Sequence, residues 1–293
     1  MDISIALGGG GAKGNCHIGV LRLLEQEGFH IRAITGSSFG GMVACFYAAG
    51  FRPAQIEEIF SSVDQSRLYD RSREESSSLL GLSRVNKWLD RNFKEKTFED
   101  LSVPCAVTAV DLRTSREIVL QKGLIRDAVL STIAIPGIFP SFISEDYELV
   151  DGALLNPVPV ALARSLAPSL PVVAVTLGTP LGKPPHPAQF PIIDNLPYPL
   201  ISSIANMRIT KAFDIYMRSI DIGSRYIAEL RFQIEKPDVI IRPEVDEVGV
   251  LDQVDVHEVA KLGEIAARKK LPELKRAAAW TARLRRSLFG DHK

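Results

Sequence analysis

The sequence predicts an α/β protein of three layers, with helices on both faces of a mostly parallel central sheet. Apolar runs typical of buried strands, such as residues 3–7, 31–35 and 172–177, alternate with segments of helical periodicity. In addition, two glycine-rich turns each follow a strand and precede a helix. The first two strands and the helix between them form a βαβ unit of ~30 residues, which makes the strands parallel with a right-handed crossover.

Length and composition are typical of a globular protein with a substantial core: 293 residues, 46% hydrophobic and 24% charged. The formal net charge of zero gives no indication of a nucleic-acid partner. We find no Gly/Ser linker and no internal repeat, so we expect one domain over residues 1–293. A helical, basic C-terminal extension is expected at about residues 261–293.

The chain shows no signal for export or membrane insertion. Residues 1–4 include no basic segment, and no apolar stretch approaches the ~20 residues that span a bilayer. Lipidation motifs are also missing, because Asp2 follows the first Met and no prenylation box ends the chain. Cys16, Cys45 and Cys105 lie in apolar segments without metal-ligand spacing, which favours buried thiols. We therefore expect a cytoplasmic protein, with peripheral contact at the inner membrane surface left open.

The first glycine-rich turn, residues 9–14, has the sequence Gly-Gly-Gly-Ala-Lys-Gly and follows the first strand. It fits a turn whose backbone N–H groups bind an anionic oxygen at the start of a helix. It also fits the Gly-x-Gly-x-x-Gly motif of a nucleotide-binding oxidoreductase. That motif usually has an acidic residue ~20 positions later, but the second strand ends in Thr35-Gly36-Ser37-Ser38. Nucleotide binding is therefore the minor alternative.

The second turn, residues 36–40, has the sequence Gly-Ser-Ser-Phe-Gly between a strand and an apolar helix. This is the setting of a Gly-x-Ser-x-Gly nucleophile elbow with Ser38 as nucleophile. We expect Gly36 and Gly40 to be required because a Cβ at either position would collide with the neighbouring strand or helix. A Gly/Ser-rich loop without chemistry fits the five residues equally well. Since both turns follow parallel strands, they meet at one sheet edge, where N–H groups of the first could form an oxyanion hole beside Ser38.

A nucleophilic serine needs a base, which is most often a histidine. None of the five histidines ends a clear strand after the elbow, and His17 fits a packed structural residue. Sequence position therefore favours a carboxylate as the base. Asp111 and Asp151 each end a strand, and a turn cap is the simpler role for Asp111. Asp151, followed by Gly152 and Ala153, fits either a turn cap or a base.

These motifs together resemble those of the patatin-like phospholipases, in particular the small bacterial single-domain members. The resemblance rests on residues 9–14, 36–40 and 151–153, which occur in the family's order. Residues 131–140 also resemble the family's stretch before the aspartate, and the likeness extends over roughly residues 3–178. The third motif is Asp-Gly-Ala instead of Asp-Gly-Gly, a variant that the family tolerates.

The resemblance implies a carboxylic ester hydrolase of phospholipase or lysophospholipase type that uses a Ser-Asp dyad and an acyl-serine intermediate. Ser38 would be the nucleophile and Asp151 the general base, partly buried and hydrogen-bonded to Ser38. The oxyanion and substrate would bind at the first turn, through Gly9, Gly10, Gly11, Lys13 and Gly14. Three further glycines would support the elbow and the dyad: Gly36, Gly40 and Gly152. Lys13 could favour an anionic head group or the oxyanion, or hold the loop in place.

The implied substrate is a lipid or another ester, with no cofactor and no metal. A catalytically silent regulatory member of the same fold is the remaining alternative, and the oligomeric state is left open.

Other segments give weaker predictions. Residues 157–167 predict a helix with Pro157 at its first position, and residues 202–233 a long helix. The proline-rich residues 178–200 fit a lid or a plain connector, and residues 64–78 a solvated excursion. Trp88 fits a core position.

The C-terminal residues 261–293 contain ten Lys/Arg against three Asp/Glu, interleaved with apolar residues such as Trp280. They fit a basic helix on an anionic membrane or, more simply, a terminal helix packed on the domain.

Overall fold

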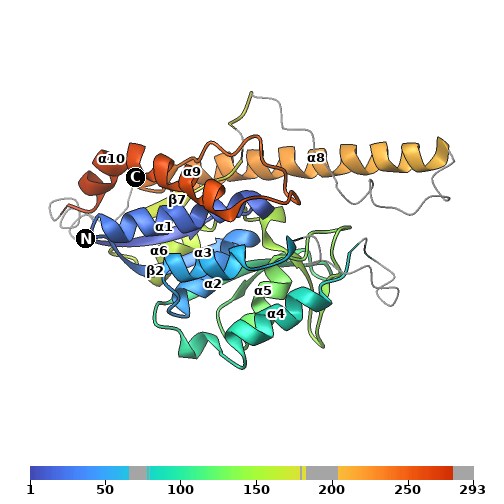
Figure 1. Cartoon of the computed structure of the whole chain (residues 1–293), viewed down its shortest axis with the longest axis horizontal. Coiled ribbons are helices and arrows are strands. Elements are labelled where there is room, and N and C mark those ends of the chain that lie inside the picture. The colour runs from blue at the N-terminus through green and yellow to red at the C-terminus, as the bar shows by residue number, and fades with distance from the viewer. Residues whose placement is uncertain (66–77, 79, 179, 183–203, 280–293) are drawn as a thin grey trace.

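The computed structural model describes residues 1–65, 78, 80–178, 180–182 and 204–279, with the backbone alone for residues 204–214 (Figure 1). It has the predicted three-layer α/β/α architecture around an eight-stranded sheet. Most of the proline-rich stretch, most of residues 64–78 and the part of the basic C-terminus that contains Trp280 lie outside the described residues. The lid, the solvated excursion and the membrane-binding tail therefore remain sequence predictions.

The sheet is mostly parallel, as predicted, and becomes antiparallel at one edge. Its order is β5-β6-β3-β2-β1-β7-β8, with β4 paired to β3. The parallel strands are β1 (Asp2–Leu7), β2 (His30–Ser37), β3 (Cys105–Asp111), β7 (Val172–Val175) and β8 (Val239–Ile241). The antiparallel strands are β4 (Arg116–Leu120), β5 (Phe142–Ile143) and β6 (Glu148–Asp151). The central β1 and β2 therefore end next to each other, at the edge where the two glycine-rich turns meet.

Helices cover both faces of this sheet. The α-helices are α1 (Cys16–Gln26), α2 (Phe39–Ala48), α3 (Pro53–Ser61), α4 (Ser83–Phe93), α5 (Ile125–Thr132), α6 (Val160–Leu166), α8 (Ile204–Glu235), α9 (Val256–Lys269) and α10 (Leu271–Ala277). Short 3-10 segments are η1 (Gly11–Asn15), η3 (Phe98–Asp100) and η4 (Gly152–Leu154).

Alternation along the strands divides the core into two parts. The large side chains Ile5 and Leu7 of β1 lie in the main core under α1, α2 and α9. The small Ala6 faces the opposite side, where it packs with Val160 of α6 and Phe232 of α8 in a smaller cluster. This period of two is typical of a strand buried on both faces.

The predicted start of the helix at Pro157 is wrong, because α6 begins at Val160. The carbonyl of Pro157 accepts a hydrogen bond from the Gly9 amide at 3.1 Å, and the carbonyl of Pro159 accepts one from the Thr35 hydroxyl at 3.0 Å. Val158, between the two prolines, is sterically biased away from helical backbone. Residues 157–159 are therefore hydrogen-bonded to Gly9, just after β1, and to Thr35 in β2, and the helix begins only after them.

Residues 261–277 are packed on the domain as parts of α9 and α10. Ala267 and Leu274 are fully buried, and Lys275 pairs with Glu27 of α1 at 2.8 Å. Across the part of the chain that the structure describes, no helix is both long enough and apolar enough to cross a membrane. The three cysteines are buried and free, as predicted.

Candidate active site

Ser38 lies at the sharp turn between β2 and α2. Its backbone adopts φ 56° and ψ −133°, a conformation that costs a non-glycine residue energy and must be held by its surroundings. The Ser38 amide donates to Thr132 Oγ1 at 2.9 Å, and Thr132 Oγ1 donates to the Thr108 carbonyl at 2.7 Å. Helix α5 and strand β3 thus stabilise the strained turn, and the Ser38 amide itself is already bonded.

The glycines on either side of Ser38 have the predicted steric role. A Cβ on Gly36 would lie 2.4 Å from the Gly40 carbonyl oxygen, and a Cβ on Gly40 would lie 2.5 Å from the carbonyl oxygens of Leu7 and Gly8. Real Cβ atoms do not approach backbone so closely, so both positions need glycine. The contact of Gly40 with Gly8 also shows that the elbow packs directly against the start of the first turn.

Asp151 is the last residue of β6 and faces Ser38 across the same edge of the sheet. Ser38 Oγ donates to Asp151 Oδ2 at 2.5 Å, while the Ala153 amide donates to Asp151 Oδ1 at 2.8 Å. Both members of the pair are about 95% buried, Ser38 being 4% and Asp151 5% exposed. Within the described residues no cation pairs with Asp151, so the expected hydrogen bond to Ser38 is present without a salt bridge.

Burial raises the pKa of Asp151 to about 7, although the hydrogen bonds from Ser38 and Ala153 act in the opposite direction. The usual pKa of an aspartic acid is about 3.9, at which the carboxylate is a weak base. A carboxyl group that is half ionised near neutral pH can both take a proton from a hydroxyl and return it. Acid–base chemistry at Ser38 is therefore chemically feasible without a histidine.

His17, which follows the first glycine-rich turn in sequence, is structural as predicted. Its Nε2 lies 2.8 Å from the Gly8 carbonyl, to which it donates, and burial lowers its pKa to about 4. His30 pairs with Asp2, and His257 pairs with Glu57, both away from Ser38. His186 and His292 lie outside the described residues.

The first glycine-rich turn lies against Ser38 with part of its backbone unoccupied. The Gly9 amide donates to Pro157, and the Ala12 amide donates to the Val250 carbonyl at 2.9 Å. By contrast, the amides of Gly10 and Gly11 donate no hydrogen bond to any described residue, and both residues line a cavity together with Ser38 and Asp151. Two free N–H groups at the start of a helix can bind an anionic oxygen.

Close packing explains most of the glycines in this turn and in the Asp151 turn. A Cβ on Gly9 would lie 3.0 Å from Ser38 Cβ, one on Gly14 would lie 2.3 Å from the ring of Phe39, and one on Gly152 would lie 2.2 Å from the Thr108 carbonyl oxygen. Gly11 has φ +58°, in the left-handed region. Any larger residue at these positions would push the turns away from Ser38.

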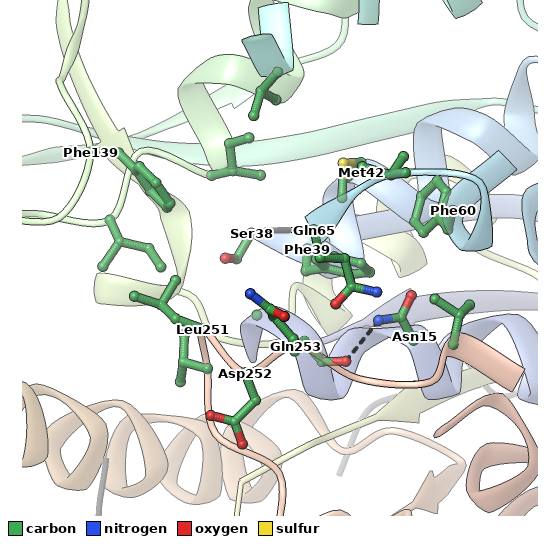
Figure 2. A pocket seen from close by; sticks show the side chains of 18 of the residues that line it. Asn15, Ser38, Phe39, Met42, Phe60, Gln65, Phe139, Leu251, Asp252 and Gln253 are labelled. Atoms are coloured by element: carbon green, nitrogen blue, oxygen red, sulfur yellow. Dashed lines mark hydrogen bonds between the residues drawn. The ribbon is translucent and has the colours of Figure 1, made fainter. Parts of the chain in front are cut away.

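A largely apolar cavity opens on one side of Ser38 (Figure 2). Phe139 lies on one side of the serine and Met42 and Phe60 on the other, while Leu251 and Gln253 approach from the loop before α9. Val63, Val85, Trp88, Ile133, Ile135 and Val256 complete most of its apolar lining. The empty space of about 920 Å³ includes the part of the mouth that is open to solvent.

A second, more polar cavity adjoins Ser38 on the side of Asp151. Lys13 lines it, and burial lowers the pKa of this lysine while the nearby Asp221 raises it. The opposite wall is the inner face of α8, including Arg218 and Arg225. Arg225 is buried and pairs with Asp221 at 2.8 Å. Ser38 therefore borders two largely apolar cavities, and the second, which we call the charged cavity, also has basic and acidic side chains in its lining.

Sequence reasoning missed the residues that shape these cavities. Trp88 fits a core position and does pack against Phe46 and Phe60, yet it also lines the apolar cavity. The loop at residues 248–253 borders both cavities, and its Val250 carbonyl holds the first turn. Helical periodicity predicts that residues 60 and 88 are buried, but nothing in the sequence of residues 248–253 indicates a binding cavity.

Asp111, in contrast, is the turn cap that the sequence predicted. Its carboxylate accepts hydrogen bonds from Thr114, Arg113 and Glu148. The hydrogen bond from the Thr114 hydroxyl is the main reason that the pKa of Asp111 lies below its usual range. Among the described residues, no three His, Cys, Asp or Glu side chains lie close enough together to hold a metal ion.

Comparison with known proteins agrees with the motifs. The family model described as patatin-like phospholipase matches residues 5–164, more than half of the chain. This match covers residues 9–14 and does not support the nucleotide-binding alternative for them.

An uncharacterized NTE family protein of Mycobacterium tuberculosis is 33% identical over 190 residues, which are 64% of this chain and 52% of that protein. Patatin-like phospholipase domain-containing protein 6 of Homo sapiens is 28% identical over 196 residues, 60% of this chain and 13% of the human protein. The chain thus matches about half the length of its mycobacterial relative and a small part of the human one. Its fold also resembles that of VipD from Legionella pneumophila, with a TM-score of 0.56 and 14% identity over 94% of this chain and 67% of VipD.

Proposed function

Because this chain belongs to the patatin-like phospholipase family, we propose that it is a lipid hydrolase that cleaves carboxylic esters through an acyl-Ser38 intermediate. The observation that supports this most directly is the 2.5 Å hydrogen bond from Ser38 Oγ to Asp151 Oδ2. A serine on a strained elbow, bonded to a buried carboxylate, is arranged like an activated nucleophile with its base.

In the first step Ser38 Oγ attacks the ester carbonyl carbon, and its proton passes to Asp151 Oδ2. The carbonyl oxygen becomes an oxyanion, for which the free amides of Gly10 and Gly11 are suitable donors. The intermediate then collapses: the bond to the alcohol breaks, the alcohol leaves with the proton from Asp151, and the acyl group remains on Ser38.

In the second step a water molecule attacks the acyl-Ser38 carbonyl. Asp151 takes the proton of the water, and the same amides can bind the second oxyanion. Collapse releases the carboxylic acid and returns the proton to Ser38. A pKa of about 7 suits Asp151 to both steps, since the carboxylate must accept a proton and give it back in each.

The two cavities beside Ser38 suggest how a lipid ester lies in the site. The apolar cavity, lined by side chains such as Met42, Phe60 and Phe139, suits the acyl chain. The charged cavity has groups of both signs, with Asp221 paired to Arg225 and Glu229 to Arg242. Its Lys13 suits an alcohol part that carries an anionic head group. In this arrangement the scissile carbonyl carbon lies at the junction, within reach of Ser38 Oγ.

A fluorophosphonate probe tests the proposal because it reacts with an activated serine and mimics the tetrahedral intermediate. We expect the wild-type chain to be labelled and Ser38→Ala to remain unlabelled. Ser37→Ala is the matched control, since Ser37 is the fully buried neighbour whose hydroxyl has no partner among the described residues. Asp151→Asn should lose turnover of a soluble ester while its circular dichroism spectrum is retained.

Two results would contradict the proposal. Failure of wild-type labelling, together with no hydrolysis of esters, would favour a catalytically silent member of the fold. Equal labelling of wild type and Ser38→Ala would mean that a different serine reacts.

A further inference from the structure

The long helix α8 packs on the domain with one side and exposes a row of large apolar side chains on the other. Figure 1 shows it along one side of the molecule, with its N-terminal end extending past the other labelled helices. On its described side-chain portion, residues 215–235, six large apolar side chains are exposed to solvent. They are Ile215, Tyr216, Ile222, Tyr226, Leu230 and Ile234, and we call them the outer face of α8.

The inner side of α8 contacts the rest of the domain through the buried Ala228 and Phe232 and also through charged groups. Arg231 pairs with Glu117 of β4 at 3.0 Å, and its Nε donates to the Leu155 carbonyl. Glu229 pairs with Arg242 at 2.6 Å, and Glu235 accepts from the Ala161 amide at 2.8 Å. Since these charges are paired within the domain while a row of apolar side chains remains exposed, the outer face is matched to an apolar phase outside the protein.

The outer face forms one continuous stripe. Ile222, Tyr226, Leu230 and Ile234 follow at intervals of four residues, so they lie on neighbouring turns of one side of the helix. Their exposed fractions are between 43% and 77%. From Ile215 to Ile234 the stripe extends about 28 Å along the helix axis, at ~1.5 Å per residue.

The same helix is a wall of the charged cavity beside Ser38. Met217, Arg218, Asp221 and Arg225 line that cavity from α8. The outer face and the cavity wall are therefore two sides of a single helix, with Arg218 bordering both. A phase that contacts the outer face would also lie next to the cavity that is suited to the alcohol part of the substrate.

We propose that the outer face of α8 binds the surface of a lipid bilayer, with the helix lying parallel to the membrane. This rests on the proposed function in one respect, since a bilayer is where a lipid ester is found. Tyr216 and Tyr226 have the apolar ring and polar tip that suit the interface between acyl chains and head groups. Arg218 is positively charged and Asp221 is paired with Arg225, so the charges at the margin do not oppose an anionic surface.

Binding through apolar side chains has a distinct salt dependence. The Debye length falls to about 3 Å at ~1 M salt, so binding through basic residues is then lost, whereas apolar insertion persists. Wild type and Ser38→Ala should therefore both sediment with phosphatidylcholine vesicles, at low salt and at ~1 M sodium chloride. The use of Ser38→Ala separates membrane binding from catalysis.

The test variant is Ile222→Gln with Leu230→Gln and Ile234→Gln, because glutamine keeps helix propensity but removes apolar surface. We expect at least tenfold weaker vesicle binding, with hydrolysis of a short soluble ester within twofold of wild type. The matched control is Val119→Gln with Ile143→Gln and Ile265→Gln, three exposed aliphatic residues outside α8. The control should bind vesicles like wild type.

Equal vesicle binding by the test variant and wild type would overturn the proposal. So would a wild type that ignores vesicles but forms a dimer by light scattering, which the test variant dissociates; the outer face would then be a subunit interface. If vesicles bind as expected but no soluble ester is hydrolysed, the proposed function fails while the membrane surface stands.

Discussion

Replacing Asp151 with asparagine removes a carboxyl group that, in the folded protein, stays protonated at pH values well above its usual pKa. Burial raises this pKa to about 7, against about 3.9 for an exposed aspartate. A raised folded-state pKa means that the contribution of the group to stability is fully present below pH ~4 and is lost as the pH rises through ~7. At ~1.36 kcal/mol per pKa unit, the loss between these limits is about 4 kcal/mol.

The assay is urea unfolding of wild type and Asp151→Asn at several pH values between about 4 and 9. The free energy of unfolding of the variant, relative to that of wild type, should increase with pH up to ~7 and then level off. The pH dependence of hydrolysis by wild type should report the same pKa of Asp151. Because Asp151 must be ionised to act as the base, kcat/KM for a soluble ester should fall about tenfold per pH unit below ~7.

Asp111→Asn is the control with the opposite sign. Hydrogen bonds hold the pKa of Asp111 below its usual range, so its stabilising contribution is present above pH ~4 and is lost on acidification. The Asp111 variant should therefore be less stable than wild type at pH 7, and the difference should shrink at low pH. If the relative stability of Asp151→Asn is the same at every pH, the folded-state pKa of Asp151 is not raised and the reasoning fails.

Three further predictions concern the turns and cavities. Gly40→Ala should lower the melting temperature and turnover, because its Cβ would lie 2.5 Å from backbone oxygens, whereas Gly223→Ala, with nothing within 4 Å, should be neutral or stabilising. Val85→Phe should fill part of the apolar cavity and lower the ratio of kcat/KM for an octanoyl ester to kcat/KM for a butyryl ester. An unchanged ratio would place the acyl chain elsewhere. Lys13→Met should raise KM for an anionic phospholipid more than for a neutral ester, and equal changes would exclude a role in head-group binding.

Most of the architecture could be predicted because the central strands and the two glycine-rich turns have strong local signals, whereas the two-residue strand β5 has none. Apolar runs predict the central strands, and clusters of glycine predict the turns that follow β1 and β2. The boundary at Pro157 could not be predicted, because it depends on hydrogen bonds from Gly9 and Thr35, which are distant in sequence. Proline was a correct sign of a turn but not of the position where the helix starts.

Ser38 could be singled out because a sharp strand-to-helix turn constrains the residues around it. The strained turn needs small neighbours, so Gly36 and Gly40 mark Ser38 in the sequence. The partner carboxylate has no such local mark, since Asp111 and Asp151 both end strands. Their hydrogen bonds in the folded structure separate them. The Asp111 carboxylate accepts from Thr114 in its own turn, whereas the Asp151 carboxylate accepts from Ser38.

The cavities could not be predicted because binding an acyl chain or a head group requires only shape and polarity. Met42, Phe60 and Trp88 would satisfy the same helical periodicity in a solid core. Residues 248–253 border both cavities and α8 lines the charged cavity, although both segments lie beyond residues 5–164, the part that the family model matches. The matched part therefore holds the Ser-Asp pair and its glycine-rich turn, while the remainder supplies much of the surface that would touch a substrate. If the proposed function holds, two family members with identical motifs can differ in substrate through residues 204–279 alone.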